Sequence, residues 1–173
     1  MSIKVIGFDL FGTVLDMRAY ATDAERRGYG RVISANPWEP FRWPPRWEYM
    51  PAFEDSREGL LHLQHDGYFV VAMSNAPLGL AMRMSCHADL HWDAIIPLET
   101  IRTYKPNPAT YKFAADLCEV APSEFLMVSA NKDFGDIEQA RVAGCRSQLI
   151  RNPGYPDTIV DLAKWLQDGK VGT

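Results

Sequence analysis

The stretch FDLFGT at residues 8–13 closes an apolar run, residues 3–8, that only Lys4 and Gly7 interrupt. A short apolar run bounded by a polar residue and a glycine turn predicts a buried β-strand, which here ends at Asp9. Gly12 and Thr13 then form the predicted turn. In open parallel α/β sheets, ligands bind at the carboxyl ends of the strands, so Asp9 is the first candidate functional residue.

The rest of the chain repeats this pattern of short apolar runs between helical segments. Further strands are predicted at residues 68–73, 94–96, 125–128 and 147–150, and helices at 16–34, 54–65, 78–89, 108–118, 136–143 and 158–167. Alternating helices and buried strands are typical of a parallel sheet covered on both sides. The sequence therefore predicts an α/β fold, a three-layer Rossmann-like sheet with helices on both faces.

One segment, residues 36–51, departs from the pattern. Its sequence NPWEPFRWPPRWEYMP holds five prolines and three of the five tryptophans. Proline at this density excludes helix interiors and central strands. Two interpretations remain open: a surface loop that packs its own tryptophans, or a lid over a site. We expect a core domain from residues 1–15 and 51–173, with a reduced cap inserted at residues 16–50.

The composition narrows the classes of function. The 173 residues are 47% hydrophobic and 23% charged, with a formal net charge of -4 and no long basic run. Nucleic-acid binding is therefore not expected, and no apolar stretch approaches the ~20 residues of a membrane span. The three cysteines, Cys86, Cys118 and Cys145, form no CxxC pair, so we expect reduced thiols and a cytoplasmic protein.

Polar residues follow three of the predicted strands. Asp9 ends the first strand, Ser74 and Asn75 the second, and Ser129 and Asn131 lie after the strand at residues 125–128. Each of these alone is more often a simple cap than a functional residue. Because the carboxyl ends of parallel strands meet at one edge of the sheet, their joint occurrence favours a site there.

Four motifs resemble those of the haloacid dehalogenase-like superfamily, in the same order. They are FDLFGT at residues 8–13, VAMSNAP at 71–77, YKPNPATY at 104–111 and LMVSANKDFGDIEQARVAG at 126–144. They extend from residue 8 to residue 144, and so span most of the chain outside residues 36–51, which we call the Trp/Pro segment. The resemblance implies a hydrolase in which the carboxylate of Asp9 attacks the substrate and forms a covalent intermediate.

The resemblance also implies roles for individual residues. Lys105 would keep Asp9 ionised, and the main chain of residues 10–13 could hold an anionic group. Asp136 would activate water or hold Lys105, with Asp133 as the alternative. The expected catalytic residues are Asp9, Thr13, Lys105, Ser129, Asn131 and Asp136, and the expected substrate-binding residues are Leu10, Phe11, Arg42, Ser74, Asn75 and Tyr111.

The residue at position 11, Phe11, distinguishes between two candidate reactions, phosphate-ester hydrolysis and carbon–halogen hydrolysis. Phosphatases of the superfamily usually carry a second aspartate there, which protonates the leaving alkoxide, and phenylalanine cannot transfer a proton. A halide ion leaves without being protonated, so Phe11 favours hydrolysis of a 2-haloacid to a 2-hydroxy acid. Phosphatases of the superfamily also usually carry an acidic magnesium ligand where this chain has Ala130, so the resemblance implies a reaction without a cofactor, with Asp133 or Asp136 as alternative magnesium ligands. The alternative is a magnesium-dependent phosphatase of small substrates, and a third hypothesis is a non-catalytic scaffold.

The predicted cap is smaller than in dehalogenases of this superfamily, which use a cap arginine for the halide. Arg42 and Arg46, set among tryptophans, are the candidates, and an arginine stacked on tryptophan at the surface is the alternative. We expect a small-molecule substrate. A second subunit could complete an open cap, so a homodimer is a candidate assembly.

Overall fold

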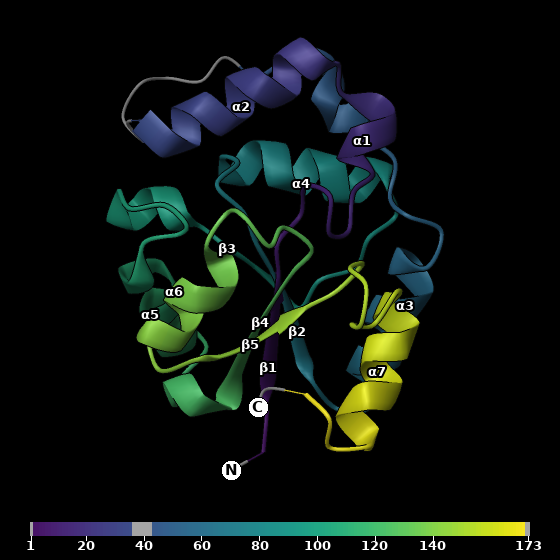
Figure 1. The fold of residues 1–173 in the computed structure, drawn as a ribbon, viewed down its shortest axis with the longest axis vertical. Coiled ribbons are helices and arrows are strands. Elements are labelled where there is room, and N and C mark those ends of the chain that lie inside the picture. Colours follow the sequence, from purple (N-terminus) through teal and green to yellow (C-terminus); the bar gives the residue numbers. More distant parts are fainter. Residues whose placement is uncertain (1, 36–42, 172–173) are drawn as a thin grey trace.

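The computed structural model describes residues 2–35 and 43–171 and contains a five-stranded parallel sheet (Figure 1). The strands are β1 (Val5–Phe8), β2 (Phe69–Met73), β3 (Ala94–Ile96), β4 (Phe125–Ser129) and β5 (Arg146–Leu149), in the order β3-β2-β1-β4-β5. β1 is central and pairs in register with β2 and β4, for example Phe8 with Ala72 and Val128. The predicted α/β class is confirmed, and Asp9 lies at the carboxyl end of the central strand.

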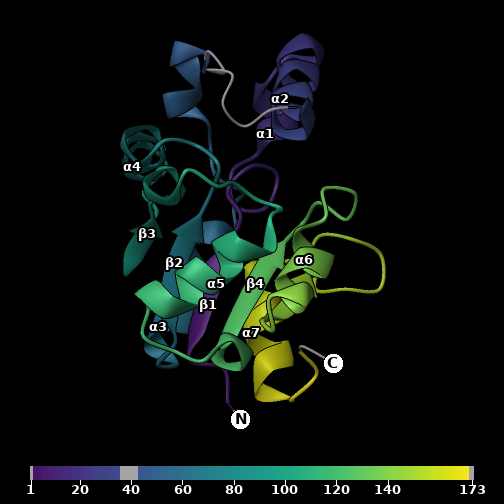
Figure 2. The same cartoon turned by 90° about the vertical axis from the view of Figure 1, so that its left-hand side faces the viewer.

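Helices cover both faces of the sheet, as the views in Figure 1 and Figure 2 agree. The helices are α1 (Met17–Tyr20), α2 (Asp23–Ala35), α3 (Ser56–His65), α4 (Leu78–His87), α5 (Pro108–Leu117), α6 (Asp136–Val142) and α7 (Ile159–Gln167), with short 3-10 helices η1 (Pro45–Tyr49), η2 (Leu98–Ile101) and η3 (Pro122–Glu124). Alternate residues of β1 serve opposite faces: Ile6 and Phe8 join the core with α3 and α7, and Val5 joins the core with α5 and α6. A strand buried on both sides explains the continuous apolar runs in the sequence.

The contact of α3 with α7 depends on a glycine. A Cβ added to Gly59 would lie 2.5 Å from the Cβ of Ile159, so only a residue without a side chain permits this close approach. These two helices cover one face of the sheet, and their contact fixes the position of α3.

The single helix predicted at residues 16–34 is wrong, because the structure has two helices separated by Ala21 and Thr22. Thr22 starts the second helix through a reciprocal cap. Its backbone N–H donates to Glu25 Oε2 at 2.7 Å, and the N–H of Glu25 donates to Thr22 Oγ1 at 3.3 Å. This S/T-x-x-E signature stops the first helix and begins the next. The other predicted elements agree with the structure within two residues at each end.

The described part of the predicted cap lies beyond the carboxyl ends of the strands, where Figure 2 shows α1, α2 and η1 above the sheet. Trp47 of η1 is completely buried and belongs to the same core cluster as Leu60 and Leu63 of α3. The division into a core and a cap domain stays a prediction. In the ranges described, no helix is long and apolar enough to cross a membrane.

Candidate active site

The loop after β1 holds Asp9 in a tight turn. The carbonyl of Leu10 accepts hydrogen bonds from Val14 N at 3.0 Å and Leu15 N at 2.9 Å, and Gly12 supports the turn with a φ of 78°. Within the described residues, the N–H groups of Leu10 and Phe11 make no hydrogen bond. Two main-chain donors therefore lie next to the carboxylate, as the sequence led us to expect for an anionic group of the substrate.

Asp9, Lys105 and Asp136 form a buried ionic triad at the end of β1. Lys105 Nζ donates to Asp9 Oδ1 at 2.7 Å and to Asp136 Oδ2 at 3.0 Å. Lys105 is 2% exposed, Asp136 0% and Asp9 7%, so water screens these charges little. Lys105 comes from the loop before α5 and Asp136 from the first turn of α6, which means that the parallel topology brings them together.

The pKa values of this triad follow from burial and the neighbouring charges. Burial raises the pKa of Asp9 above 3.8, with a further rise from Asp136, and the attraction of Lys105 offsets only part of this. Burial alone would lower the pKa of Lys105, but the charges of Asp136 and Asp9 outweigh it, and the net shift is upward from 10.5. Lys105 is therefore a permanent cation between two carboxylates.

Two hydroxyls orient the carboxylates. Thr13 Oγ1 donates to Asp9 Oδ2 at 3.1 Å and accepts from Ala130 N at 2.9 Å, which links the loops after β1 and β4. Tyr111 donates its phenol proton to Asp136 Oδ1 at 2.6 Å. Burial first, and then the charge of Asp136, raises the pKa of Tyr111, so that it remains a donor. Each carboxylate oxygen of the triad thus has a fixed partner.

Asn75 contacts the main chain of Lys105. Its Nδ2 donates to Lys105 O at 2.9 Å, and its Oδ1 accepts from Lys105 N at 2.8 Å. One N–H of the amide is left for a contact with the substrate, the role that the sequence predicts for Asn75. Ser74 Oγ accepts from Ala76 N at 3.1 Å, which leaves its proton free to be donated.

The predicted site residues at and after the end of β4 differ in burial. Ser129 is buried and its Oγ accepts from Asn131 N at 3.2 Å, whereas Asn131 and Asp133 are exposed. Among the residues described, neither Ser129 nor Asn131 bonds to the triad, and their predicted catalytic roles stay predictions. Of the two acidic candidates left open by the sequence, Asp136 reaches Lys105.

Four aromatic rings form a cluster beside Asp9, which we call the aromatic cluster: Phe11, Tyr29, Trp43 and Trp47. The ring of Phe11 stacks on Trp43 at 5.7 Å and lies 5.2 Å from Tyr29 and 5.4 Å from Trp47. Burial, followed by the charges of Asp9 and Asp136, raises the pKa of Tyr29. The described tryptophans of residues 36–51 thus pack on each other and on Phe11, and the lid interpretation stays a prediction. Tyr29 was missed in the sequence because no motif contains it.

Of the two arginine candidates for binding the halide, the structure describes Arg46. Arg42 lies outside the described residues. Arg46 donates to Tyr20 O at 3.0 Å, pairs with Glu25, and lies 5.0 Å from the centre of the Tyr20 ring. Its guanidinium therefore ties η1 to α1 and α2, and the suggestion that Arg46 binds halide is not supported by its contacts.

The residues present make a poor magnesium site. Mg²⁺ requires near-octahedral oxygen ligands, and the two buried carboxylates of the triad already share the Lys105 ammonium. Over the described ranges, no group of three or more His, Cys, Asp or Glu side chains could hold a metal ion.

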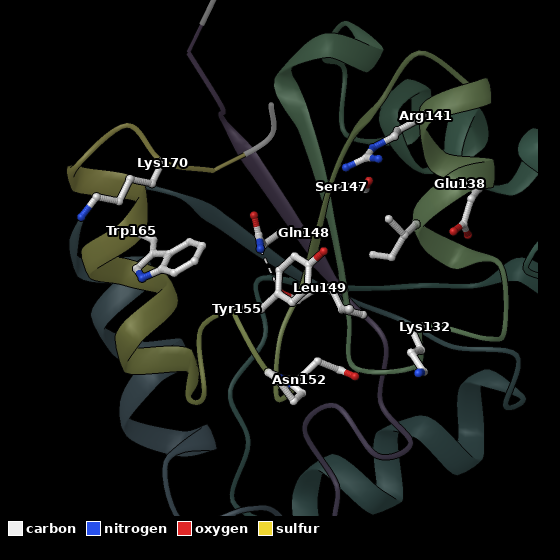
Figure 3. A pocket seen from close by; sticks show the side chains of 12 residues that line it. Lys132, Glu138, Arg141, Ser147, Gln148, Leu149, Asn152, Tyr155, Trp165 and Lys170 are labelled. Carbon is white, nitrogen blue, oxygen red and sulfur yellow. Dashed lines mark hydrogen bonds between the residues drawn. The ribbon is translucent and has the colours of Figure 1, made fainter.

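A separate hollow of about 620 Å³ lies along the free edge of β5 (Figure 3). Its lining includes Lys132, Arg141, Gln148, Tyr155 and Trp165, drawn from α6, β5 and α7 and the loops beside them. None of the triad residues lines it. The chemistry at Asp9 therefore does not take place in this hollow.

No family model matches the chain. Two curated proteins are similar to it in sequence, and both are (S)-2-haloacid dehalogenases. The (S)-2-haloacid dehalogenase 4A of Burkholderia cepacia is 31% identical over 113 residues, which span 64% of this chain but only 48% of that protein. The (S)-2-haloacid dehalogenase of Xanthobacter autotrophicus is 26% identical, over 92% of this chain and 83% of that protein.

A solved structure extends the likeness to the fold. The L-2-haloacid dehalogenase from Xanthobacter autotrophicus with chloropropionic acid covalently bound superimposes with a TM-score of 0.74. It is 18% identical, and the match covers 95% of this chain and 98% of that one. At this identity the likeness concerns the fold.

Proposed function

We propose that this chain, which has the haloacid dehalogenase-like fold, is a hydrolase that cleaves the carbon–halogen bond of small 2-haloacids through an ester formed on Asp9. The observation that carries the proposal is the buried Asp9 carboxylate at the end of β1, held by Lys105 and Thr13 at 2.7 and 3.1 Å. A carboxylate removed from bulk water and oriented at both oxygens is a competent nucleophile.

The surroundings of Asp9 favour a leaving group that needs no proton. Phe11 is buried in the aromatic cluster two residues after the nucleophile, where a general acid would be needed for an alkoxide. Halide is a very weak base and departs with the bonding electrons. The apolar rings also suit the carbon chain of a small haloacid.

The substrate carboxylate would be held by main-chain donors. The N–H groups of Leu10 and Phe11, which have no acceptor among the residues described, belong to the two residues that follow Asp9, and the Ser74 hydroxyl still carries a proton to donate. Such hydrogen bonds to an anion are stronger than those between neutral groups. They would place the α-carbon of the haloacid against the Asp9 carboxylate.

The reaction would then take two steps. In the first, an Asp9 oxygen bonds to the α-carbon, and the carbon–halogen bond breaks with release of halide and inversion at that carbon. In the second, water attacks the carbonyl carbon of the Asp9 ester. The ester carbon–oxygen bond at the carboxyl group breaks, one water proton ends on the 2-hydroxy acid, and the other is released. Asp136 would orient the water or hold Lys105.

The test compares two substrate classes. Purified protein is assayed for halide release from both enantiomers of 2-chloropropionate and for phosphate release from p-nitrophenyl phosphate, each with magnesium and with chelator. We expect halide release that survives chelator and is abolished by Asp9→Asn. Magnesium-dependent phosphate release without halide release would instead support the phosphatase alternative.

A second experiment addresses the ester itself. In a single turnover in heavy-oxygen water, the label should enter the Asp9 carboxylate and not the product, because the product oxygen comes from Asp9. The Asp9 peptide is analysed by mass spectrometry. Direct incorporation of the label into the hydroxy acid, with unlabelled Asp9, would rule out the ester mechanism.

A further inference from the structure

Arg151 ties three distant parts of the chain together beneath the nucleophile loop. It lies two residues after β5, and its side chain is 14% exposed. Its Nε donates to Thr13 O at 2.8 Å, and its Nη2 bonds both carboxylate oxygens of Asp55 at 2.9 and 3.0 Å. The guanidinium also lies 4.1 Å from the centre of the Phe53 ring. The guanidinium thus donates hydrogen bonds through Nε and Nη2 and lies against an aromatic ring.

The partner of Arg151 in the first loop is the residue that orients Asp9. Thr13 is fully buried, and its hydroxyl bonds Asp9 Oδ2 while its carbonyl accepts from Arg151. A shift of this carbonyl moves the hydroxyl on the same residue. The position of Thr13 therefore depends on a side chain 138 residues further along the chain.

Asp55 holds the other end of the guanidinium. Besides its pairing with Arg151, Asp55 Oδ2 accepts from Ile159 N at 2.7 Å, at the start of α7. Because α3 and α7 are fixed to the sheet, Asp55 is anchored to the rigid part of the molecule. The guanidinium is held by other contacts as well, because its Nη1 donates to Asp157 O at 3.2 Å and the Phe53 ring lies against it. Its Nε therefore stays at Thr13 O even when the charge of Asp55 is removed.

We propose that Arg151 is a positioning residue for the Asp9 nucleophile, acting through the carbonyl of Thr13. The inference rests on the proposed function for its kinetic test, but the contacts that carry it do not. Arg151 does not touch the substrate or the reacting atoms. Its role is to hold the loop at residues 10–15 so that the Asp9 carboxylate points at the α-carbon.

The experiment compares three variants in the full chain. Arg151→Met keeps the apolar stem over Phe53 and removes all donors. Arg151→Lys keeps the positive charge but lacks the planar guanidinium with its several N–H donors. Asp55→Asn weakens the ion pair and leaves the hydrogen bond from Arg151 to Thr13 O in place. We expect kcat to fall at least about tenfold in Arg151→Met with KM nearly unchanged, and partial recovery in Arg151→Lys, because misplacing a reacting group lowers turnover more than binding. Asp55→Asn should lower the melting temperature but leave kcat within about threefold of the wild type.

Hydrogen exchange gives a readout that needs no turnover. The N–H groups of residues 12–15 are hydrogen-bonded within the loop. Their exchange should be at least about tenfold faster in Arg151→Met, and close to the wild type in Asp55→Asn.

Two results would overturn the proposal: unchanged loop exchange in Arg151→Met, or equal losses of kcat in Arg151→Met and Asp55→Asn. If the wild type releases no halide from any haloacid, the proposed function fails separately, and the loop exchange rates alone decide the role of Arg151.

Discussion

Replacing Lys105 by methionine would leave two carboxylates in the core without their common cation. Lys105 Nζ lies 2.7 Å from Asp9 and 3.0 Å from Asp136, and Asp136 has no exposed surface. The two oxygens lie within about 6 Å of each other, where two unit charges repel by about 3 kcal/mol at an effective dielectric constant of 20. Removing one partner of a buried ion pair generally costs about 3–5 kcal/mol. We expect a loss of that size in the free energy of unfolding at pH 8.

The loss should depend on pH in one direction. The pKa of Asp9 in the folded protein is already above 3.8, and without Lys105 it rises further. A group whose folded pKa is raised stabilises the fold below its unfolded pKa, and this contribution is lost as the pH rises through the folded value. The deficit of Lys105→Met relative to the wild type should therefore be smaller at pH 5 than at pH 8.

Urea unfolding followed by tryptophan fluorescence measures both quantities. Adding Asp136→Asn removes one of the repelling charges, so the double variant should be more stable than the sum of the single losses implies, by at least about 1 kcal/mol. Lys112→Met is the control, because its ion pair with Asp116 is exposed and should change stability by less than about 1 kcal/mol. A deficit below about 1 kcal/mol for Lys105→Met, or the same deficit at both pH values, would refute the reasoning.

Three further predictions concern the same structure. The acid limb of kcat/KM should have its midpoint above pH 3.8, because burial raises the pKa of Asp9 and only the ionised form attacks; a midpoint at or below that value contradicts this. Tyr111→Phe leaves Asp136 short of a donor at 2.6 Å and should cost about 1–3 kcal/mol in chemical unfolding, whereas a loss within measurement error would mean that the bond is unimportant. Cys86 is exposed, while burial raises the pKa of Cys145 to about 11, so a thiol reagent at pH 8 should label Cys86 in the folded protein and Cys145 only after unfolding, as peptide mass spectrometry would show.

The strands, and the proximity of Asp9 and Lys105, could be predicted because each depends on a short local sequence pattern. A short apolar run marks each buried strand, and parallel topology then brings the residues at the strand ends together. The placement of Asp136 beside Lys105 also follows from the register of α6 after the fourth motif.

Other features depend on contacts that no local pattern records. The amide of Asn75 binds the main chain of Lys105, 30 residues away, and nothing in either segment distinguishes this from a halide contact. Arg151 lies in no motif, and its partners are 96 and 138 residues distant. The helix break at Thr22 did have a local signal, the capping pair with Glu25. The apolar residues around it are scattered through a polar stretch and did not mark the boundary.

The burial of Trp47, which packs against Phe11, Tyr29 and Trp43 on a 3-10 helix that contacts α4, has a consequence for substrate entry. A tryptophan buries about 200 Å² or more, so pulling it into water would cost about 5 kcal/mol. The described part of the predicted cap thus shares the main hydrophobic core, and opening it far enough to expose Trp47 would remove a large part of the stability of the fold. The proposed small-acid substrate would therefore enter and leave through small movements of α1 and α2, with the Trp47 indole still buried.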